Sequence, residues 1–237
     1  MKSNIPKEKK VIEAMFNNIA HRYDFLNHLL SGGFDIIWRR KVVNVLKKHN
    51  PKTILDIATG SGDMAINAIK INPDKIIGID ISEEMLSVAI EKIKKRKLEN
   101  KIEIIKADAE NLEFADNTFD AITVCFGVRN FENLEKGLKE IHRVLKPNGI
   151  VVILEFSKPK TPVIKELYEF YLKKVIPFIG KKVSNNIIAY EYLYDSVTDF
   201  PKGIKFIEIL EELEFINCKY EKITFGITIL YMALKKN

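Results

Sequence analysis

Two amphipathic helices are predicted in the first 50 residues. Apolar residues recur there at helical spacing in two separate stripes. The stripes consist of Val11, Ile12, Met15, Phe16 and Ile19, and of Trp38, Val42, Val43, Val45 and Leu46. A polar and aromatic segment at residues 21–24 and the sequence Ser31-Gly32-Gly33 lie between them. We therefore expect residues 1–50 to form an N-terminal helical lid.

From residue 51 onward, short apolar runs alternate with helical patterns. Strands are predicted over residues 53–57, 75–79, 102–105, 119–126 and 150–156, and helices over 64–71, 82–98 and 134–145. Ser82 offers an N-cap, and the turn Lys146-Pro147-Asn148-Gly149 ends the third helix. This alternation predicts an α/β fold in which parallel strands are joined by right-handed crossovers and helices cover both faces.

The C-terminal third follows a different pattern. Residues 158–202 carry aromatics and prolines without clean strand runs, and a helix is predicted over 204–213. Two β-rich runs, 215–224 and 227–234, are separated by Phe225-Gly226, so we expect an antiparallel hairpin at the sheet edge. The whole chain is interpreted as one domain. It comprises the lid (1–50), a cofactor-binding core (51–157), a helical substrate-side insertion (158–202) and a terminal helix with a β-hairpin (203–237).

Composition and charge narrow the class of protein. The hydrophobic fraction of 46% and the charged fraction of 30% are those of a soluble globular protein. No apolar stretch approaches the ~20 residues that span a bilayer. Cys125 and Cys218 lack metal-ligand spacing, which favours a reducing, cytoplasmic setting and no metal site. The net charge of +6 is mostly compositional background with a lean toward anionic membrane surfaces, and no nucleic-acid platform is present.

A glycine-rich loop carries the strongest local signal. The first core strand contains Asp56 and runs into Gly60-Ser61-Gly62, where glycines let a ligand approach the backbone just before a helix begins. Asp80 ends the next strand about 20 residues later, where a carboxylate can accept hydrogen bonds from both ribose hydroxyls of an adenosine. These residues predict a site for an adenosine-containing cofactor.

The loop alone does not identify that cofactor. Residues 60–65 also satisfy the G-x-G-x-x-A pattern of dinucleotide-binding enzymes, so an NAD-dependent oxidoreductase is an open alternative. Asp56 lies inside a strand, where a carboxylate needs a cation or backbone donors, and S-adenosylmethionine is cationic whereas a pyrophosphate is anionic. Asp108 can accept a hydrogen bond from an adenine amino group, and the terminal hairpin is unusual for a dinucleotide fold. Together these features favour S-adenosylmethionine.

Further segments identify a family resemblance. The chain resembles the ubiquinone/menaquinone biosynthesis C-methyltransferases along nearly its whole length. The matching segments include Arg22-Tyr23-Asp24-Phe25-Leu26-Asn27, Ala107-Asp108-Ala109-Glu110, Phe126-Gly127-Val128-Arg129-Asn130 and Leu154-Glu155-Phe156-Ser157. Two departures are mild: Ser61 stands where many members have threonine, and Asn148 replaces a glycine in a turn.

The resemblance implies a fold, an activity and site residues. The fold is the class I S-adenosylmethionine-dependent (Rossmann-like) methyltransferase fold, a seven-stranded, mostly parallel sheet with an antiparallel last strand. The activity is C-methylation of a polyprenylated quinol, as in demethylmenaquinol to menaquinol, with the ubiquinone-pathway benzoquinol as a further acceptor. The cofactor contacts expected from the loop and the resemblance are Asp56, Gly60, Ser61, Gly62, Asp80, Ile81, Met85, Asp108, Ala109 and Cys125.

The chemistry of a quinol suggests catalytic candidates. Its ring carbon becomes nucleophilic when a hydroxyl group loses its proton, so a group that stabilises the phenolate is needed. Arg129 follows the fourth core strand and is the first candidate, with a merely ion-pairing arginine as the alternative. Tyr23 and Asp24 lie in the lid and either contact the site or pack the first helices. His21 and His142 are general-base candidates by type.

A lipophilic acceptor implies contact with a membrane. Lysines 173, 174, 181 and 182 flank apolar residues between 175 and 179, which suits transient, peripheral docking on the inner face of the membrane. The aromatic span 168–194 either lines a prenyl channel or belongs to the core. A docking module that keeps the fold without activity is a third, non-enzymatic alternative. The sequence leaves the oligomeric state open, a homodimer included.

Overall fold

A seven-stranded sheet forms the centre of the molecule. The computed structural model describes residues 8–159, 161–163, 166, 170–171 and 187–237. The strands lie in the order β3-β2-β1-β4-β5-β7-β6. They are β1 (Thr53–Ile57), β2 (Lys75–Asp80), β3 (Ile102–Lys106), β4 (Phe119–Cys125), β5 (Leu145–Phe156), β6 (Phe215–Ile223) and β7 (Thr228–Lys235). The first five pair in parallel, and β7 is antiparallel to both β5 and β6.

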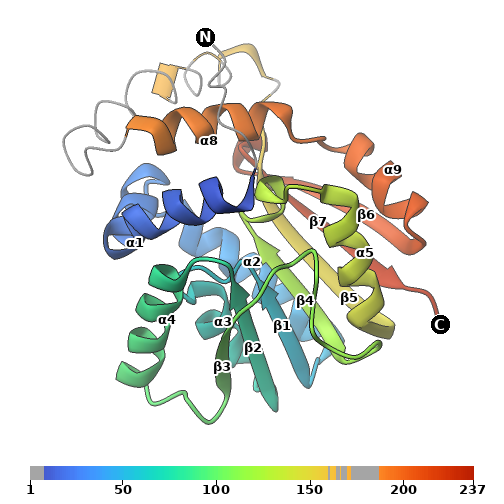
Figure 1. The fold of residues 1–237 in the computed structure, drawn as a ribbon. Helices are drawn as coiled ribbons and strands as arrows, with labels where there is room; N and C mark the ends of the chain where they lie inside the picture. Colours follow the sequence, from blue (N-terminus) through green and yellow to red (C-terminus); the bar gives the residue numbers. More distant parts are fainter. Residues whose placement is uncertain (1–7, 160, 164–165, 167–169, 172–186) are drawn as a thin grey trace.

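Helices cover both faces of this sheet, as the alternating pattern predicts (Figure 1). The described α-helices are α1 (Lys9–Leu30), α2 (Phe34–His49), α3 (Asp63–Ala68), α4 (Glu83–Lys95), α5 (Leu134–Val144), α8 (Ile187–Asp199) and α9 (Ile204–Glu212). One core joins the sheet to α5 and α9, through Leu138 and Phe206 among others. A second core joins it to α2, α3 and α4, through Leu46, Ala65 and Ile93. The predicted class of fold is confirmed.

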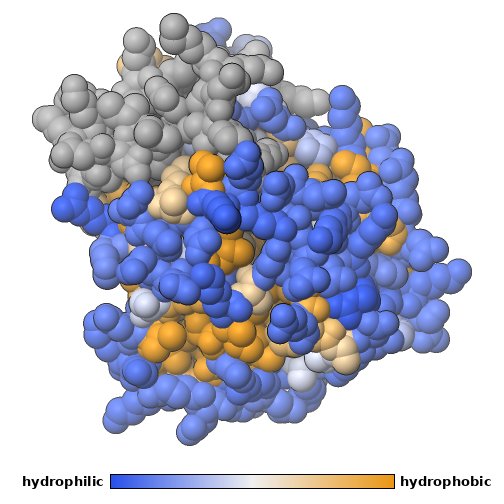
Figure 2. Space-filling model, viewed as in Figure 1, coloured by the Kyte–Doolittle hydropathy of each residue, from blue (hydrophilic) through white to orange (hydrophobic). Residues whose placement is uncertain are grey.

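The connection between β3 and β4, residues 107–118, contains no helix. On the face of the sheet that α5 and α9 cover, Ile77 of β2 and Ile105 of β3 are only partly buried. Figure 2 shows an apolar area low on the face in view, between α4 and the sheet, while polar side chains cover most of the remaining surface. The α5–α9 face is therefore less completely covered over β2 and β3 than over β4 and β5.

Local signals set the starts of helices better than their ends. Met85 N donates to Ser82 Oγ at 3.3 Å, which confirms the predicted N-cap of α4, but the helix ends at Lys95 rather than at residue 98. α3 stops at Ala68 and continues as a short 3₁₀ turn, Ile69–Ile71, that ends at Asn72. Asn72 has φ of 58°, a left-handed conformation that asparagine tolerates.

β5 begins earlier than predicted. It starts at Leu145, directly after α5, because Leu145 pairs with Phe119 of β4 before the ladder resumes at Ile150. The turn between them includes Asn148 at φ of 63°, which agrees with the expectation that asparagine can replace glycine there. Lys146 in the same turn donates to Asp120 Oδ1 at 2.7 Å. Tertiary pairing therefore converts a predicted loop into the start of a strand.

The C-terminal hairpin is confirmed, with its two strands in a specific order. β7 lies between β5 and β6, so β6 is the outermost strand. The turn between β6 and β7 contains Phe225 at φ of 57° and Gly226 at φ of 86°. Because glycine adopts positive φ without penalty, Gly226 suits this turn.

The two N-terminal helices are confirmed, but they lie in different places. α1 crosses the edge of the sheet where the parallel strands end (Figure 1), and Ser82 Oγ donates to its Asn17 at 2.6 Å. α2 instead packs on the sheet, where its apolar stripe is buried. The expected lid position is thus taken by α1 alone. None of the described helices is long and apolar enough to span a bilayer.

Candidate functional site

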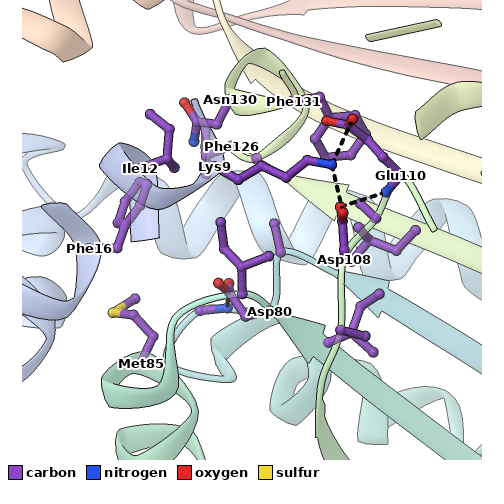
Figure 3. A pocket seen from close by; sticks show the side chains of 18 of the residues that line it. Lys9, Ile12, Phe16, Asp80, Met85, Asp108, Glu110, Phe126, Asn130 and Phe131 are labelled. Atoms are coloured by element: carbon purple, nitrogen blue, oxygen red, sulfur yellow. Dashed lines mark hydrogen bonds and ion pairs between the residues drawn. The ribbon is translucent and has the colours of Figure 1, made fainter. Parts of the chain in front are cut away.

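A pocket lies at the carboxyl ends of the parallel strands, beneath α1 (Figure 3). The hollow has a volume of about 700 Å³ when the part that is open to solvent is included. Its wall includes Lys9, Ile12, Phe16, Tyr23, Gly60, Asp80, Ile81, Met85, Asp108, Ala109, Glu110, Cys125, Phe126 and Asn130. Seven of the ten predicted cofactor-binding residues therefore share this wall, and Asp56, Ser61 and Gly62 do not.

Backbone groups hold the Asp80 carboxylate in place. Its Oδ2 accepts from Gly60 N at 2.9 Å and its Oδ1 from Ser82 N at 3.0 Å. Burial raises the pKa of Asp80, and these backbone donors oppose that shift. Gly60 has φ of 56°, and a Cβ added there would lie 3.0 Å from Met85 Cε. A glycine suits this point because a side chain would be strained at this φ and would press on the end of Met85.

Asp108 carries a second carboxylate at the end of the neighbouring strand. Its Oδ1 accepts from Glu110 N at 2.9 Å, which again fixes the side chain through the backbone. Its Oδ2 accepts from Lys9 Nζ at 2.7 Å, and the same ammonium lies 3.0 Å from Glu110 Oε2 (Figure 3). Lys9 was missed by the sequence analysis, since it belongs to no motif and stands 99 residues from Asp108.

Asp56 lies beside the pocket wall rather than in it. Thr59 Oγ1 and Thr123 Oγ1 each donate to the carboxylate at 2.6 Å, and burial raises its pKa to about 6. A cation or backbone donors were expected for this group; the backbone of Ala65 and the charge of Arg39 do stabilise it, in addition to the two threonine hydroxyls. Thr123 pairs with Asp56 across β1 and β4, so the strand register supplies this partner.

Ser61 and Gly62 belong to the glycine-rich loop but lie outside the pocket wall. Ser61 is buried and its Oγ donates to the carboxylate of Asp24 from α1. Lys92 Nζ donates to Asp24 Oδ2 at 2.6 Å and also binds Asp63. Gly62 has φ of 80° and precedes α3. The predicted catalytic residue Asp24 therefore does not line the pocket but links α1 to the glycine loop.

Tyr23 does line the pocket. A Cβ added at Gly60 would lie 4.0 Å from Tyr23 Cε1, and Phe16 packs edge-on against the Tyr23 ring at 6.0 Å between centroids. Burial raises the pKa of Tyr23, which keeps the phenol protonated at neutral pH. Cys125 also lies in the wall, and burial raises the pKa of its thiol. Neither group is poised as a base.

Arg129 is buried next to the pocket and does not appear in its wall. Its guanidinium donates to Glu155 Oε1 at 2.8 Å, to Ser196 Oγ at 3.3 Å and to the carbonyl oxygen of Phe126. It also lies 5.6 Å from the centroid of the Phe156 ring. This geometry matches the alternative of an ion-pairing arginine. Contact between Arg129 and an acceptor oxygen stays a prediction.

The wall next to Arg129 is formed by Asn130. Tyr192 Oη donates to Asn130 Oδ1 at 3.1 Å, and burial raises the pKa of Tyr192 to about 12. Asn130 belongs to a segment that resembles the family, and no role was expected for it from the sequence. The arginine thus fixes the short turn Val128–Asn130, and the asparagine presents its amide to the pocket.

Neither candidate histidine reaches the pocket wall. His21 is exposed, with its Nε2 3.9 Å from Glu84. His142 packs edge-on against Phe215 at 4.8 Å between centroids, and burial lowers its pKa. The charged side chains in the described pocket wall are Lys9, Asp80, Asp108, Glu110 and Glu132.

One group of residues has the spacing of a metal site. Ligand atoms of His28, Asp35 and Asp63 lie within 4.8 Å of one another. Arg39 donates to Asp35 and lies 3.7 Å from Asp63, and Lys92 also binds Asp63. These two side chains already supply positive charge to the cluster, so it joins α1, α2, α3 and α4 as an ion-pair network.

Two sequence expectations cannot be placed. The membrane-docking lysines 173, 174, 181 and 182 lie outside the described residues. Most of the aromatic span 168–194 does so too, except residues 170–171 and the part of it in α8. Tyr192, in that helix, is buried and reaches Asn130 of the pocket wall.

Comparisons with known proteins find relatives that match nearly the whole chain. A family model described as the ubiE/COQ5 methyltransferase family matches residues 3–235. A demethylmenaquinone methyltransferase of Bacteroides fragilis is 47% identical over 234 residues, covering 98% of this chain and 96% of that protein. A ubiquinone/menaquinone biosynthesis C-methyltransferase UbiE of Geotalea daltonii is 43% identical over 226 residues, covering 94% and 96%.

Solved structures agree on the fold. The [4+2]-cyclase SpnF superposes with a TM-score of 0.65 at 14% identity, covering 98% of this chain and 97% of that one. A Haemonchus contortus phosphoethanolamine N-methyltransferase in complex with S-adenosyl-L-methionine gives a TM-score of 0.62 at 19% identity, covering 84% and 53%. Similarity at this level shows a shared fold alone, since such folds host many activities. The match over residues 3–235, together with these full-length relatives, shows that the chain belongs to the ubiE/COQ5 methyltransferase family.

Proposed function

We propose that this protein methylates a ring carbon of a polyprenylated quinol with S-adenosylmethionine as the methyl donor. The observation that carries the proposal is the pair of carboxylates, Asp80 and Asp108, fixed by backbone donors at neighbouring strand ends in one pocket. Relatives that cover nearly the whole chain are named as demethylmenaquinone methyltransferases. Demethylmenaquinol is therefore our first acceptor.

The pocket residues suit the donor. Asp80 can accept both ribose hydroxyls, and Asp108 can accept the adenine amino group between the apolar Ala107 and Ala109. Met85 and Ile81 offer apolar contacts to the same ligand. Gly60 leaves room for the ligand beside the backbone. The donor supplies a methyl group that is activated by its positively charged sulfur.

Several residues would orient the acceptor. Ile12, Phe16 and Phe126 give the pocket an apolar side that fits a quinol ring. Tyr23 stays protonated and can donate a hydrogen bond to a ring oxygen. Asp24 acts at a distance, because it holds α1 against the glycine loop through Ser61 and Lys92.

Arg129 is assigned a positioning role in this proposal. Its ion pair with Glu155 and its bond to the Phe126 carbonyl set the turn that carries Asn130. The Asn130 amide can then donate to an acceptor oxygen while Tyr192 donates to the amide oxygen. A hydrogen-bond donor at this point stabilises the phenolate that makes the ring carbon nucleophilic.

A lipophilic acceptor also places the enzyme at a membrane surface. We propose a cytoplasmic protein that docks peripherally and transiently on the inner face of the membrane. The benzoquinol of ubiquinone synthesis is a second acceptor, because a relative with 43% identity is named for both pathways. The NAD-dependent alternative has no support among these relatives.

The test is a methylation assay with demethylmenaquinol and the corresponding benzoquinol, each followed by mass analysis of the product. We expect a gain of one methyl group on the naphthoquinol ring. Calorimetric titration with S-adenosylhomocysteine and with NADH runs beside it, and we expect binding of the first alone. Binding of NADH, or cofactor binding without methylation of either quinol, would contradict the proposed function.

A further inference from the structure

Exposed apolar side chains gather at the corner where α1 meets α2. Five large apolar residues between positions 25 and 37, together with the residue at the β6–β7 turn, have exposed fractions of 42–75%. We call this set the corner patch; it consists of Phe25, Leu29, Phe34, Ile36, Ile37 and Phe225. Single exposed apolar residues are ordinary, but such a grouping marks an interaction surface.

The corner patch is held together by specific contacts. Trp38 Nε1 donates to Thr224 Oγ1 at 2.8 Å, which brings the turn with Phe225 against α2. Phe34 stacks on Trp38 with 6.2 Å between centroids. Gly32 and Gly33, both at positive φ, form the tight turn that brings the end of α1 to the start of α2. The patch therefore combines the adjoining ends of α1 and α2 with the β6–β7 turn, which is remote in sequence.

A row of aromatic rings connects the corner patch to the pocket. Phe126 lies in the pocket wall and is 5.8 Å from Trp38 between centroids. Phe156 stacks on Phe126 at 4.4 Å and lies 5.9 Å from Trp38. Phe34, at the outer end of the row, is exposed. The corner patch is thus linked to the pocket wall through packed, buried aromatic side chains.

The charges around the corner patch fit an anionic surface. Residues 20–41 contain four Arg or Lys and two Asp. The two acids are paired within the protein, Asp24 with Lys92 and Asp35 with Arg39 and His28. Two of the four basic residues are paired as well, since Arg39 is buried against Asp35 and Lys41 pairs with Glu221. Arg22 and Arg40 are exposed next to the apolar residues. Exposed arginines beside exposed aromatic side chains suit docking at the interface of an anionic membrane.

We infer that the corner patch is the surface that docks this protein on an anionic lipid bilayer, with Phe34, Ile37 and Phe225 entering the interface. The inference rests on the proposed function, because the acceptor's prenyl tail is what calls for a bilayer. It differs from the docking segment expected from the sequence, which was placed at residues 173–182.

Trp38 makes the inference testable without a label. It is the sole tryptophan of the chain, is 2% exposed and lies directly under the corner patch. Vesicles of phosphatidylglycerol and phosphatidylcholine, with and without a spin-labelled lipid, are titrated into the full-length protein. We expect binding that weakens with salt, and quenching of Trp38 by the spin label.

Matched variants locate the docking surface. Phe34→Ser/Ile37→Ser, and separately Phe225→Ser, should each weaken vesicle binding, by roughly tenfold for each apolar side chain removed. The control is Ile204→Ser/Ile216→Ser, which removes exposed apolar side chains from α9 and from the far end of β6. It should bind vesicles like the parent protein.

Several results would overturn the inference. They are unchanged binding by the corner variants, an equal loss in the control, or vesicle binding without quenching of Trp38. A change in the mass of the corner variants in solution, with vesicle binding intact, would make the patch a contact between copies of the chain.

Separate assays test the proposed function independently of the docking surface. Corner variants should keep S-adenosylhomocysteine binding and methylation of a tail-free demethylnaphthoquinol, and should lose turnover of the prenylated acceptor in vesicles. Absence of methylation in the parent protein would count against the enzyme while the vesicle result still decides the docking surface.

Discussion

The two sides of the pocket are held by different kinds of interaction. On the strand side, backbone N–H groups fix the two carboxylates. Asp80 accepts from the glycine loop and from the residue two positions later, and Asp108 also accepts from the residue two positions later. On the α1 side, Lys9 and Asp24 hold the helix through side-chain ion pairs that cross 68–99 residues of sequence. Partly exposed ion pairs of this kind contribute about 0–1 kcal/mol each and weaken with salt. We therefore expect the strand side to be the more rigid part and α1 to be the part that opens to admit ligands.

The Arg129–Glu155 ion pair should give the largest effect, since it uses side chains yet is buried. Removing one partner of a buried pair costs about 3–5 kcal/mol, because the other charge is left uncompensated. We expect Arg129→Met and Glu155→Gln each to lower the free energy of unfolding by this order, measured in urea. Arg129→Met/Glu155→Met should lose less than the sum of the two single effects.

Turnover of the Arg129 variant and of a variant at Asn130 tests the positioning role of Arg129. Asn130→Ala should lower kcat without the loss of stability, because Asn130 carries the donor and Arg129 only places it. An Arg129→Met protein with full stability and full turnover would remove the arginine from both roles.

Asp80 tests the rigid side directly. Hydrogen bonds to a charged group contribute about 1.5–3 kcal/mol, so Asp80→Ala should weaken S-adenosylhomocysteine binding about 100-fold. Calorimetry measures this change, and Glu91→Ala, at an exposed position on α4, is the control. Equal affinity in Asp80→Ala and the parent protein would show that the ligand does not sit at this strand end.

Asp56 should give the rigid side a pH dependence. Its pKa is raised from 3.8 to about 6, so the folded state holds a proton that the unfolded state has already lost. The free energy of unfolding should therefore fall as pH rises from about 4 to about 6, by about 1–3 kcal/mol. Asp56→Asn should lack this decline, whereas Asp74→Asn, at an exposed position, should keep it. Parallel pH curves for the parent and Asp56→Asn would contradict the raised pKa.

Lys9 should give the smallest effect. Its ammonium occupies the same Asp108 oxygen that would accept from an adenine amino group. Replacing it with methionine removes a competing ion pair of about 0.2–1 kcal/mol, so cofactor binding should tighten by up to about fivefold at low salt. Lys9→Arg should behave like the parent. Weaker binding in Lys9→Met would mean that the lysine contacts the ligand instead.

Much of the rigid side could be predicted because its signals are local. The glycines, Asp80 and Asp108 stand at the ends of apolar strand runs, and parallel strands bring their carboxyl ends to one edge. The role of Asp56 was harder, since its partner Thr123 is fixed only by the β1–β4 register. The start of β5 at Leu145 was also missed, because a pairing with Phe119 overrides the turn signal.

The sequence by itself determined the alternation of strands and helices, the class of fold and the carboxylates at neighbouring strand ends, because hydrophobic period and strand ends are properties of short segments. The tertiary structure alone decided that Lys9 meets Asp108, that Arg129 is bound by Glu155, and that Phe34 and Phe225 share one surface. Those contacts join segments 26–186 residues apart, and their partners are set by strand order and helix packing rather than by any local pattern.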